Sequence, residues 1–185
     1  MHKRWLAAIV LTAWMGGTLA ADNDCSNASA NEAKALALKA AAQLEKLGKE
    51  QAFRNFMDPE GEFFPRDLYV IVVDLDGTMW VNGAYPQGIG SSALGAQDQK
   101  GRRYIEQMLR MAMEHGEGWI EYQWFNPCTG DYTDKKTFFK RVGRFVVAVG
   151  AYRNPKNMAA NSFVDRGARY LAAFAPTLPL PASVR

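Results

Sequence analysis

Histidine is nearly absent from this sequence. Of the two histidines, His2 lies in the N-terminal segment, so His115 is the only one in the body of the chain. Most zinc sites and histidine-based hydrolytic triads are thereby excluded. His115 follows a helical pattern and precedes Gly116, as is typical of a helix C-terminus. We expect no metal site, and the predicted function described below involves no catalytic residue and no cofactor.

The sequence also lacks a strong excess of one charge. It has 22 Lys and Arg against 19 Asp and Glu, and two of the basic residues, Lys3 and Arg4, lie at the extreme N-terminus. The remaining chain is close to neutral and has no basic cluster, which argues against a nucleic acid as partner.

Long apolar runs are absent after residue 20. The one run near the N-terminus, Trp5 to Trp14, follows a basic start and precedes the small residues Gly16 to Ala20. This pattern predicts a secretory signal peptide over residues 1–20, because the run is too short for the alternative, a transmembrane helix. We expect a periplasmic or secreted protein that does not insert into a membrane after cleavage.

Only two cysteines are present, Cys25 and Cys128. In an oxidising compartment they can pair and close a loop of roughly 100 residues, which would stabilise the fold by about 4 to 5 kcal/mol in the chain-entropy model. The alternative is a free or intermolecular Cys25 on a loose N-terminus, since an even count does not establish a pairing.

Helical periodicity occurs in three places in the body of the chain. A capping-box pattern at Ser29 to Glu32 opens a long amphipathic helix that ends at Gly48, and a shorter helix follows over 50–57. A third helix is predicted over 102–114. Beyond the main body, residues 154–185 form a tail with one candidate helix, 163–174, and a Pro-rich end.

The strand-like segments favour an α+β fold. Residues 68–73 and 78–81 are joined by Asp-Gly, and 119–125, 136–142 and 144–152 by short turn sequences. Hairpin connections predict an antiparallel sheet, with 68–73 and 145–149 as central strands covered on both faces. The long helix can cover one face, and residues 82–114 can cover the other.

The stretch Asp74-Leu75-Asp76-Gly77-Thr78 after a β-branched run is similar to the nucleophile motif of haloacid dehalogenase-type phosphatases. Such a phosphatase needs a later acidic pair for magnesium, and the best later strand ends in Ala151-Tyr152-Arg153 without one. We therefore interpret Asp74 and Asp76 as turn residues that accept backbone N–H groups.

Aromatic and basic side chains on the strands suggest a pocket for a small anion. Alternation places Ile120, Tyr122 and Trp124 on one sheet face, and it places Lys136 and Lys140 beside Phe138. A one-residue change of register would exchange these lysines for Lys135 and Arg141. Plain core aromatics with lysines that reach solvent are the alternative. The predicted ligand-binding residues are Tyr69, Trp80, Trp119, Tyr122, Trp124, Lys136, Phe138 and Lys140.

Three segments closely resemble the single Cache family of extracytoplasmic ligand-sensing domains: "DLYVIVVDLDGTMWVNG", "GEGWIEYQWFNPCTG" and "KKTFFKRVGRFVVAVGAYR". The resemblance implies a PAS-like antiparallel sheet of five or six strands over residues 21–153. A long N-terminal helix is expected on one face and a small-molecule pocket on the other. Many relatives have a tyrosine where this chain has Phe138. A phenol that could bind the ligand is therefore missing here, so the ligand class can differ from that of the relatives.

The resemblance implies a non-catalytic periplasmic protein that binds or senses a small, anionic metabolite such as a short carboxylate. In the relatives, the chain continues into a membrane helix and a signalling module. This sequence has no such segment after the domain, so we expect the signal to pass to a partner such as a membrane sensor or transporter. The alternative is a dimeric structural or interaction protein with a vestigial pocket, in which the long helix serves a homodimer.

Overall fold

The computed structural model describes residues 28–126 and 130–153. The predictions for the signal peptide, Cys25, Cys128 and the tail 154–185 lie outside these residues. The elements in chain order are α1 (Ala30–Phe56), β1 (Val70–Asp74), β2 (Met79–Asn82), the 3₁₀ helix η1 (Pro86–Gly88), α2 (Tyr104–His115), β3 (Glu117–Asn126), β4 (Asp131–Val142) and β5 (Phe145–Tyr152).

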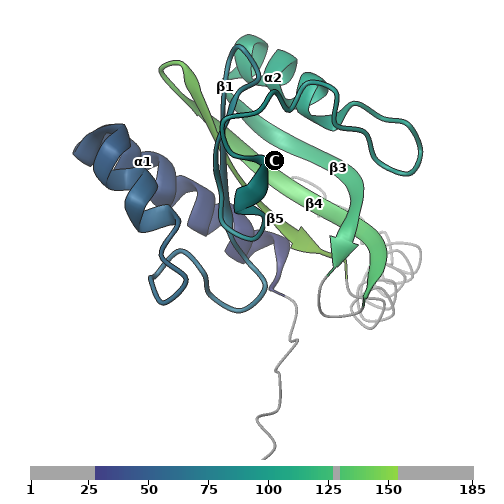
Figure 1. Cartoon of the computed structure of the whole chain (residues 1–185), viewed down its shortest axis with the longest axis horizontal. Coiled ribbons are helices and arrows are strands. Elements are labelled where there is room, and N and C mark those ends of the chain that lie inside the picture. The colour runs from purple at the N-terminus through teal and green to yellow at the C-terminus, as the bar shows by residue number, and fades with distance from the viewer. Residues whose placement is uncertain (1–27, 127–129, 154–185) are drawn as a thin grey trace, which may run out of the picture.

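The five strands form one antiparallel sheet in the order β2-β1-β5-β4-β3 (Figure 1). The hairpins β1–β2, β3–β4 and β4–β5 follow the predicted connections, and β5 returns to pair with β1. The predicted α+β class and antiparallel sheet are therefore confirmed, with five strands. The central strand β5 reads Phe-Val-Val-Ala-Val-Gly-Ala-Tyr, which suits burial on both faces.

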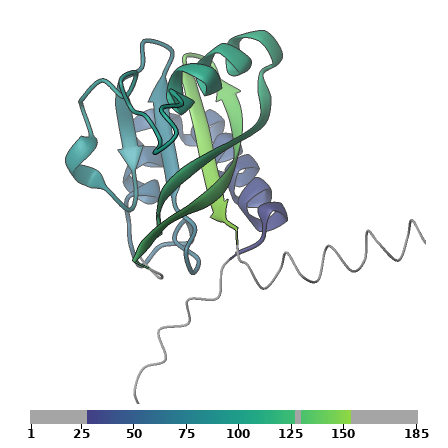
Figure 2. The same cartoon turned by 90° about the vertical axis from the view of Figure 1, so that its right-hand side faces the viewer.

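Helix α1 covers one face of the sheet and lies behind the strands in Figure 2. Its N-terminus carries the predicted capping box, in which Ser29 and Glu32 each accept a hydrogen bond from the other's backbone N–H. Gly48, with φ 73° and ψ 168°, interrupts the helix where the sequence predicted a break. The buried residues of α1 are mostly alanines, which let the helix axis approach the strands closely.

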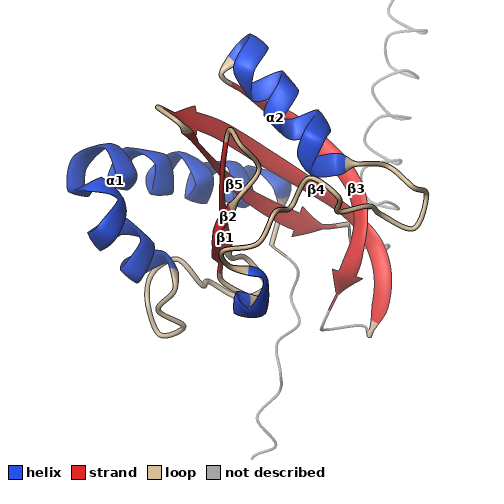
Figure 3. Ribbon diagram, turned by 45° about the horizontal axis from the view of Figure 1, so that its top comes forward, coloured by secondary structure: helices blue, strands red, loops and turns tan. Residues whose placement is uncertain are grey.

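The two sheet faces have separate cores, and α1 and α2 lie on opposite sides of the sheet (Figure 3). On the α1 face the strands contribute Val70, Val72 and Phe138. On the α2 face Ile71 and Phe139 pack against the apolar side of α2. The strict alternation of neighbours between the two cores explains why the strands are apolar at successive positions.

Asp74 organises the turn between β1 and β2. Its carboxylate accepts the backbone N–H groups of Asp76 and Thr78 at 3.1 and 2.9 Å and the indole N–H of Trp80 at 2.8 Å. Arg144 donates to both Asp74 and Asp76 and so connects this turn to the β4–β5 turn. Burial alone would raise the pKa of Asp74, but these donors lower it below its ordinary value. The turn interpretation is confirmed, and β1 leads into a hairpin instead of a parallel strand and helix.

Replacing Asp74 with Ala should lower the free energy of unfolding by about 2 to 3 kcal/mol, because buried donors lose their acceptor. The side chain of Asp74 is only 3% exposed, whereas that of Asp76 is 78% exposed. Asp76→Ala is therefore the matched control and should cost at most about 1 kcal/mol. Urea denaturation measures both values, and equal losses would contradict the assigned role of Asp74.

Candidate functional site

A cavity of about 180 Å³ lies between the α2 face of the sheet and the segment that joins β2 to α2. It is therefore on the face opposite α1, as the resemblance implied. The residues that line it are Tyr69, Ile71, Met79, Asn82, Gly88, Ser91, Ser92, Ala93, Ala96, Tyr104, Ile105, Tyr122 and Trp124.

Aromatic rings form a connected wall around this cavity. Tyr104 stacks on Tyr122 with ring centroids 4.1 Å apart and nearly parallel planes. Trp124 contacts Tyr104 edge-on at 5.7 Å and Tyr85 at 6.1 Å, and Tyr85 contacts Tyr69 at 6.2 Å. Such edge-to-face and stacked pairs fix ring orientation, so the wall is rigid and largely apolar.

A buried lysine lies directly behind the Tyr69 side of this wall. Lys135 is 1% exposed, and its ammonium donates a hydrogen bond to the Tyr69 hydroxyl at 2.7 Å. The same ammonium lies 4.0 Å from the ring centroid of Tyr69 and 4.4 Å from that of Tyr152. Two aromatic faces and one phenol oxygen therefore stabilise a positive charge that is removed from water.

Gly150 provides the space through which the Lys135 side chain reaches Tyr69. Strand β5 lies between β4, which carries Lys135, and β1, which follows Tyr69. A β-carbon on Gly150 would lie 2.6 Å from Cε of Lys135 and 2.2 Å from Oγ1 of Thr137. Any other residue at this position would obstruct the lysine, so the missing side chain is a structural requirement.

Lys135 is held without a close carboxylate partner. Burial lowers its pKa to about 7, and the negative charge of Asp67 opposes this shift. No ion pair of Lys135 within 4.0 Å occurs among the residues that the structure describes. Asp67 instead accepts the backbone N–H of Ala28 at 2.8 Å. An anion placed beside a buried ammonium in this state would stabilise it.

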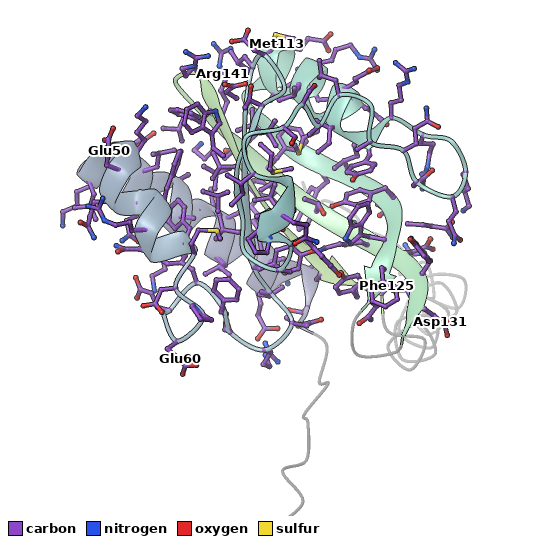
Figure 4. All side chains as sticks on the ribbon, in the orientation of Figure 1. Glu50, Glu60, Met113, Phe125, Asp131 and Arg141 are labelled. Carbon is purple, nitrogen blue, oxygen red and sulfur yellow. The ribbon has the colours of Figure 1, made fainter. Side chains whose placement is uncertain are left out.

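The phenols around Lys135 are neutral hydrogen-bonding groups. Burial raises the pKa of Tyr122 to about 12 and that of Tyr69 well above its ordinary value. Thr137 donates to the Tyr122 hydroxyl at 3.2 Å, and Tyr152 donates to the carbonyl of Phe125 at 2.7 Å. Phe125 is labelled in Figure 4, at the end of the β3–β4 hairpin and opposite the end that carries Met113 and Arg141. The hydrogen bond from Tyr152 to Phe125 therefore connects the phenols around Lys135 to the end of the sheet at which the β3–β4 hairpin turns.

Asp98 attaches the cover of the cavity to the edge strand β3. Its side chain is fully buried and accepts hydrogen bonds from the backbone N–H of Lys100, from the backbone and side chain of Arg102, and from the Gln123 N–H. Burial raises the pKa of Asp98, but these donors outweigh it and bring the pKa to about 2. Asp98 therefore fixes the C-terminal end of the segment between β2 and α2 to strand β3.

The structure divides the predicted site residues between the two sheet faces. Three of the eight, Tyr69, Tyr122 and Trp124, line the cavity. The other five lie on the α1 face or at its rim: Trp80, Trp119, Lys136, Phe138 and Lys140.

Strand register explains this division. Odd-numbered residues of β4 lie on the cavity side of the sheet, so Lys135 takes the place that the sequence analysis gave to Lys136 and Lys140, as its alternative register foresaw. Lys136 pairs instead with Glu121 at 3.4 Å and Lys140 with Glu117 at 2.8 Å, all on partly exposed side chains. The candidate cation of the site is thereby corrected to Lys135.

Tyr85, Tyr104 and Gly150 were missed by the sequence analysis. Tyr85 lies in a segment without strong periodicity, and Tyr104 is the first residue of a helix whose buried face was predicted from Ile105 onwards. Gly150 could have been noticed as the one glycine inside an apolar β-branched run, a position that often marks close approach of another group.

An antiparallel sheet with a helix on one face and an aromatic-lined cavity under a loop and helix on the other is the architecture of a PAS-like fold. Residues 18–165 match the model of the family described as Single Cache domain 2. The chain belongs to this family, whose members are ligand-binding modules of signal transduction.

Solved structures with this fold include chemotaxis sensor domains. A methyl-accepting chemotaxis protein from Vibrio parahaemolyticus RIMD 2210633 superposes with a TM-score of 0.58 and 17% identity, over 66% of this chain and 86% of that one. The periplasmic sensor domain of a chemotaxis protein gives a TM-score of 0.54 and 20% identity, over 67% and 90% of the two chains.

A third structure is described as the basis for carboxylic acid recognition by a Cache chemosensory domain. It superposes with a TM-score of 0.53 and 16% identity, over 67% of this chain and 88% of that one. At these identities the three structures establish the fold. A search of curated proteins found no match.

Two further features concern only residues 28–126 and 130–153. No helix in these ranges is both long and apolar enough to cross a membrane. The same ranges contain no group of three or more His, Cys, Asp and Glu side chains arranged to hold a metal ion.

Substituting Ala for Gly150 should lower the free energy of unfolding by about 1 to 3 kcal/mol, because the added methyl group overlaps Lys135 and Thr137. Adding Lys135→Ala to this variant should restore part of the loss, since two of the three closest contacts disappear. Gly95→Ala, with no atom within 4 Å of the new carbon, is the control and should change stability by less than about 0.5 kcal/mol. Thermal and urea denaturation report all three, and simple additivity of the two changes would contradict the assigned contact.

Proposed function

We propose that this protein is a non-catalytic, extracytoplasmic domain that binds a small organic anion, such as a short carboxylate, in the cavity beside Tyr69. The observation that carries the proposal is the ammonium of Lys135, which is buried on the cavity side of the sheet and hydrogen-bonded to a cavity-lining phenol. Burial of a lysine without an anionic partner is costly and lowers its pKa, and an anion bound beside it would offset that cost.

The Tyr69 hydroxyl is the group through which the charge of Lys135 reaches the cavity. Its oxygen accepts the lysine N–H, and its own proton is shared with the Tyr152 hydroxyl. A carboxylate on the cavity side would take over this proton as a stronger acceptor than a neutral phenol. Donation from the positive ammonium polarises the phenol and makes it a stronger donor, and the low local dielectric strengthens the attraction to a negative ligand. The aromatic wall excludes the water that would otherwise screen it.

The comparisons support the same ligand class. One structure of the same fold is described as recognising carboxylic acids, and others are chemotaxis sensor domains. The N-terminal pattern of residues 1–20 supports export to the periplasm or beyond. We propose a membrane sensor or transporter as the partner that receives the ligand signal.

Lys135→Met should weaken the binding of a short carboxylate such as propanoate by at least about thirtyfold, because the buried cation is lost. The ligand-free variant should be as stable as the wild type or more stable, since a desolvated charge is replaced by an apolar chain of similar length. Isothermal titration calorimetry and thermal denaturation provide the two measurements.

The matched control is Lys140→Met on the α1 face, where the side chain is 35% exposed and paired with Glu117. It should leave the affinity unchanged. If Lys140→Met weakens binding and Lys135→Met does not, the site lies on the other face. If no carboxylate stabilises the wild type, the alternative of a dimeric interaction protein with a vestigial pocket is favoured.

Carboxylate affinity should be constant below about pH 6.5 and should fall above pH 7, approaching tenfold per pH unit. The pKa of Lys135 is lowered to about 7 by burial, and a bound anion raises it, so binding takes up a proton above that pH. Tyr69 and Tyr152, the phenols that face the ammonium, stay neutral over this range because burial raises their pKa. The negative charge of Asp67 raises the pKa of Lys135 and so opposes the effect of burial. Titration calorimetry from pH 5.5 to 9 tests this, and the same profile in Lys135→Met would contradict it.

A further inference from the structure

The size of the cavity restricts the ligand class. An apolar cavity of about 150 Å³ holds one benzene molecule. The cavity described above is about 180 Å³, which leaves room for one six-membered ring and a carboxylate. A two- or three-carbon acid would leave much of this volume without contacts, and unfilled apolar space forfeits dispersion energy.

The charges around the cavity restrict the ligand further. No residue that lines it, within the described part of the chain, is acidic or basic. Lys135 behind Tyr69 supplies one positive charge, and Asp98 near the cover is fully occupied by its backbone and arginine donors. Asn82, Ser91 and Ser92 offer hydrogen bonds, but a second carboxylate or an ammonium group on the ligand would be buried without an oppositely charged partner, at a high cost in free energy.

The wall favours a flat ring over a branched aliphatic chain. Tyr104 and Tyr122 stack almost parallel, with an interplanar angle of 9°, and Trp124 stands edge-on to Tyr104. Aromatic rings held in fixed orientations offer faces and edges at the spacings that another ring prefers, and such ring pairs are favourable beyond the area that they bury.

We infer that the ligand is a monocarboxylate with one six-membered ring, of about the size of benzoate. This inference rests on the proposed function and specifies it. The carboxylate lies at the Tyr69 end and is separated from Lys135 by the Tyr69 hydroxyl. The ring occupies the space between Tyr104, Trp124 and the alanines of the cover, Ala93 and Ala96.

Calorimetric titration of the wild-type protein with matched probes tests the inference. The probes are acetate, benzoate, benzamide as the neutral analogue, and phthalate as the dianion. Benzoate should bind at least about tenfold more tightly than each of the others, because it alone fills the volume and carries a single charge. Phthalate binding as tightly as benzoate would overturn the restriction to one carboxylate.

A variant that fills the cavity provides an independent test. Ala93→Leu adds three carbon atoms at the cover, so it should weaken benzoate at least about tenfold and leave acetate binding unchanged or tighter. Ala35→Leu, on the exposed side of α1, is the control and should change neither affinity. Equal effects of Ala93→Leu on the two acids would overturn the assignment of the ring to this space.

The outcomes separate this inference from the proposed function. If acetate binds the wild type as tightly as benzoate or more so, the ring is refuted, whereas the anion site stands. If benzamide binds as tightly as benzoate and Lys135→Met has no effect, the anion site itself is refuted, and the ring inference falls with it.

Discussion

The proposed binding site depends on one unfavourable arrangement, the burial of the Lys135 ammonium against Tyr69. An ammonium that leaves water loses much of its hydration, and here two aromatic rings and one phenol oxygen replace only part of it. This loss of hydration lowers the pKa of Lys135 to about 7, although the charge of Asp67 opposes the shift. In the proposed function, the surrounding residues make this burial tolerable in the free protein, and a bound anion makes it favourable.

The scaffold supplies the conditions for that arrangement. The strands alternate strictly between two cores, so α1 can stabilise one face while the other encloses a cavity. Gly150 in the central strand lets the lysine cross from β4 toward Tyr69. At the edge, Asp98 fixes the cover to β3 through donors that leave its carboxylate no free acceptor for a ligand. The α1 face of the sheet therefore holds a close-packed core, whereas the α2 face encloses the cavity in which we propose that the ligand binds.

Much of the fold could be predicted from sequence because periodicity and turn chemistry are local. The capping box at Ser29, the break at Gly48 and the Asp74 turn all follow from neighbouring residues. The site could be predicted only in part. Tyr122 and Trp124 were grouped by alternation, but the choice between Lys135 and Lys140 depends on which face each strand presents, and this follows from pairings distant in sequence.

The central claim is that Lys135 is a desolvated cation that an anionic ligand completes, and its titration tests this most directly. Nuclear magnetic resonance of the protein with isotope-labelled lysine, assigned by comparison with Lys135→Met, follows each side chain from pH 5 to 11. The account predicts one lysine that titrates near pH 7 in the free protein and at a clearly higher pH when a carboxylate is bound. A Lys135 that titrates near the ordinary value of about 10.4, unchanged by any carboxylate, would contradict it.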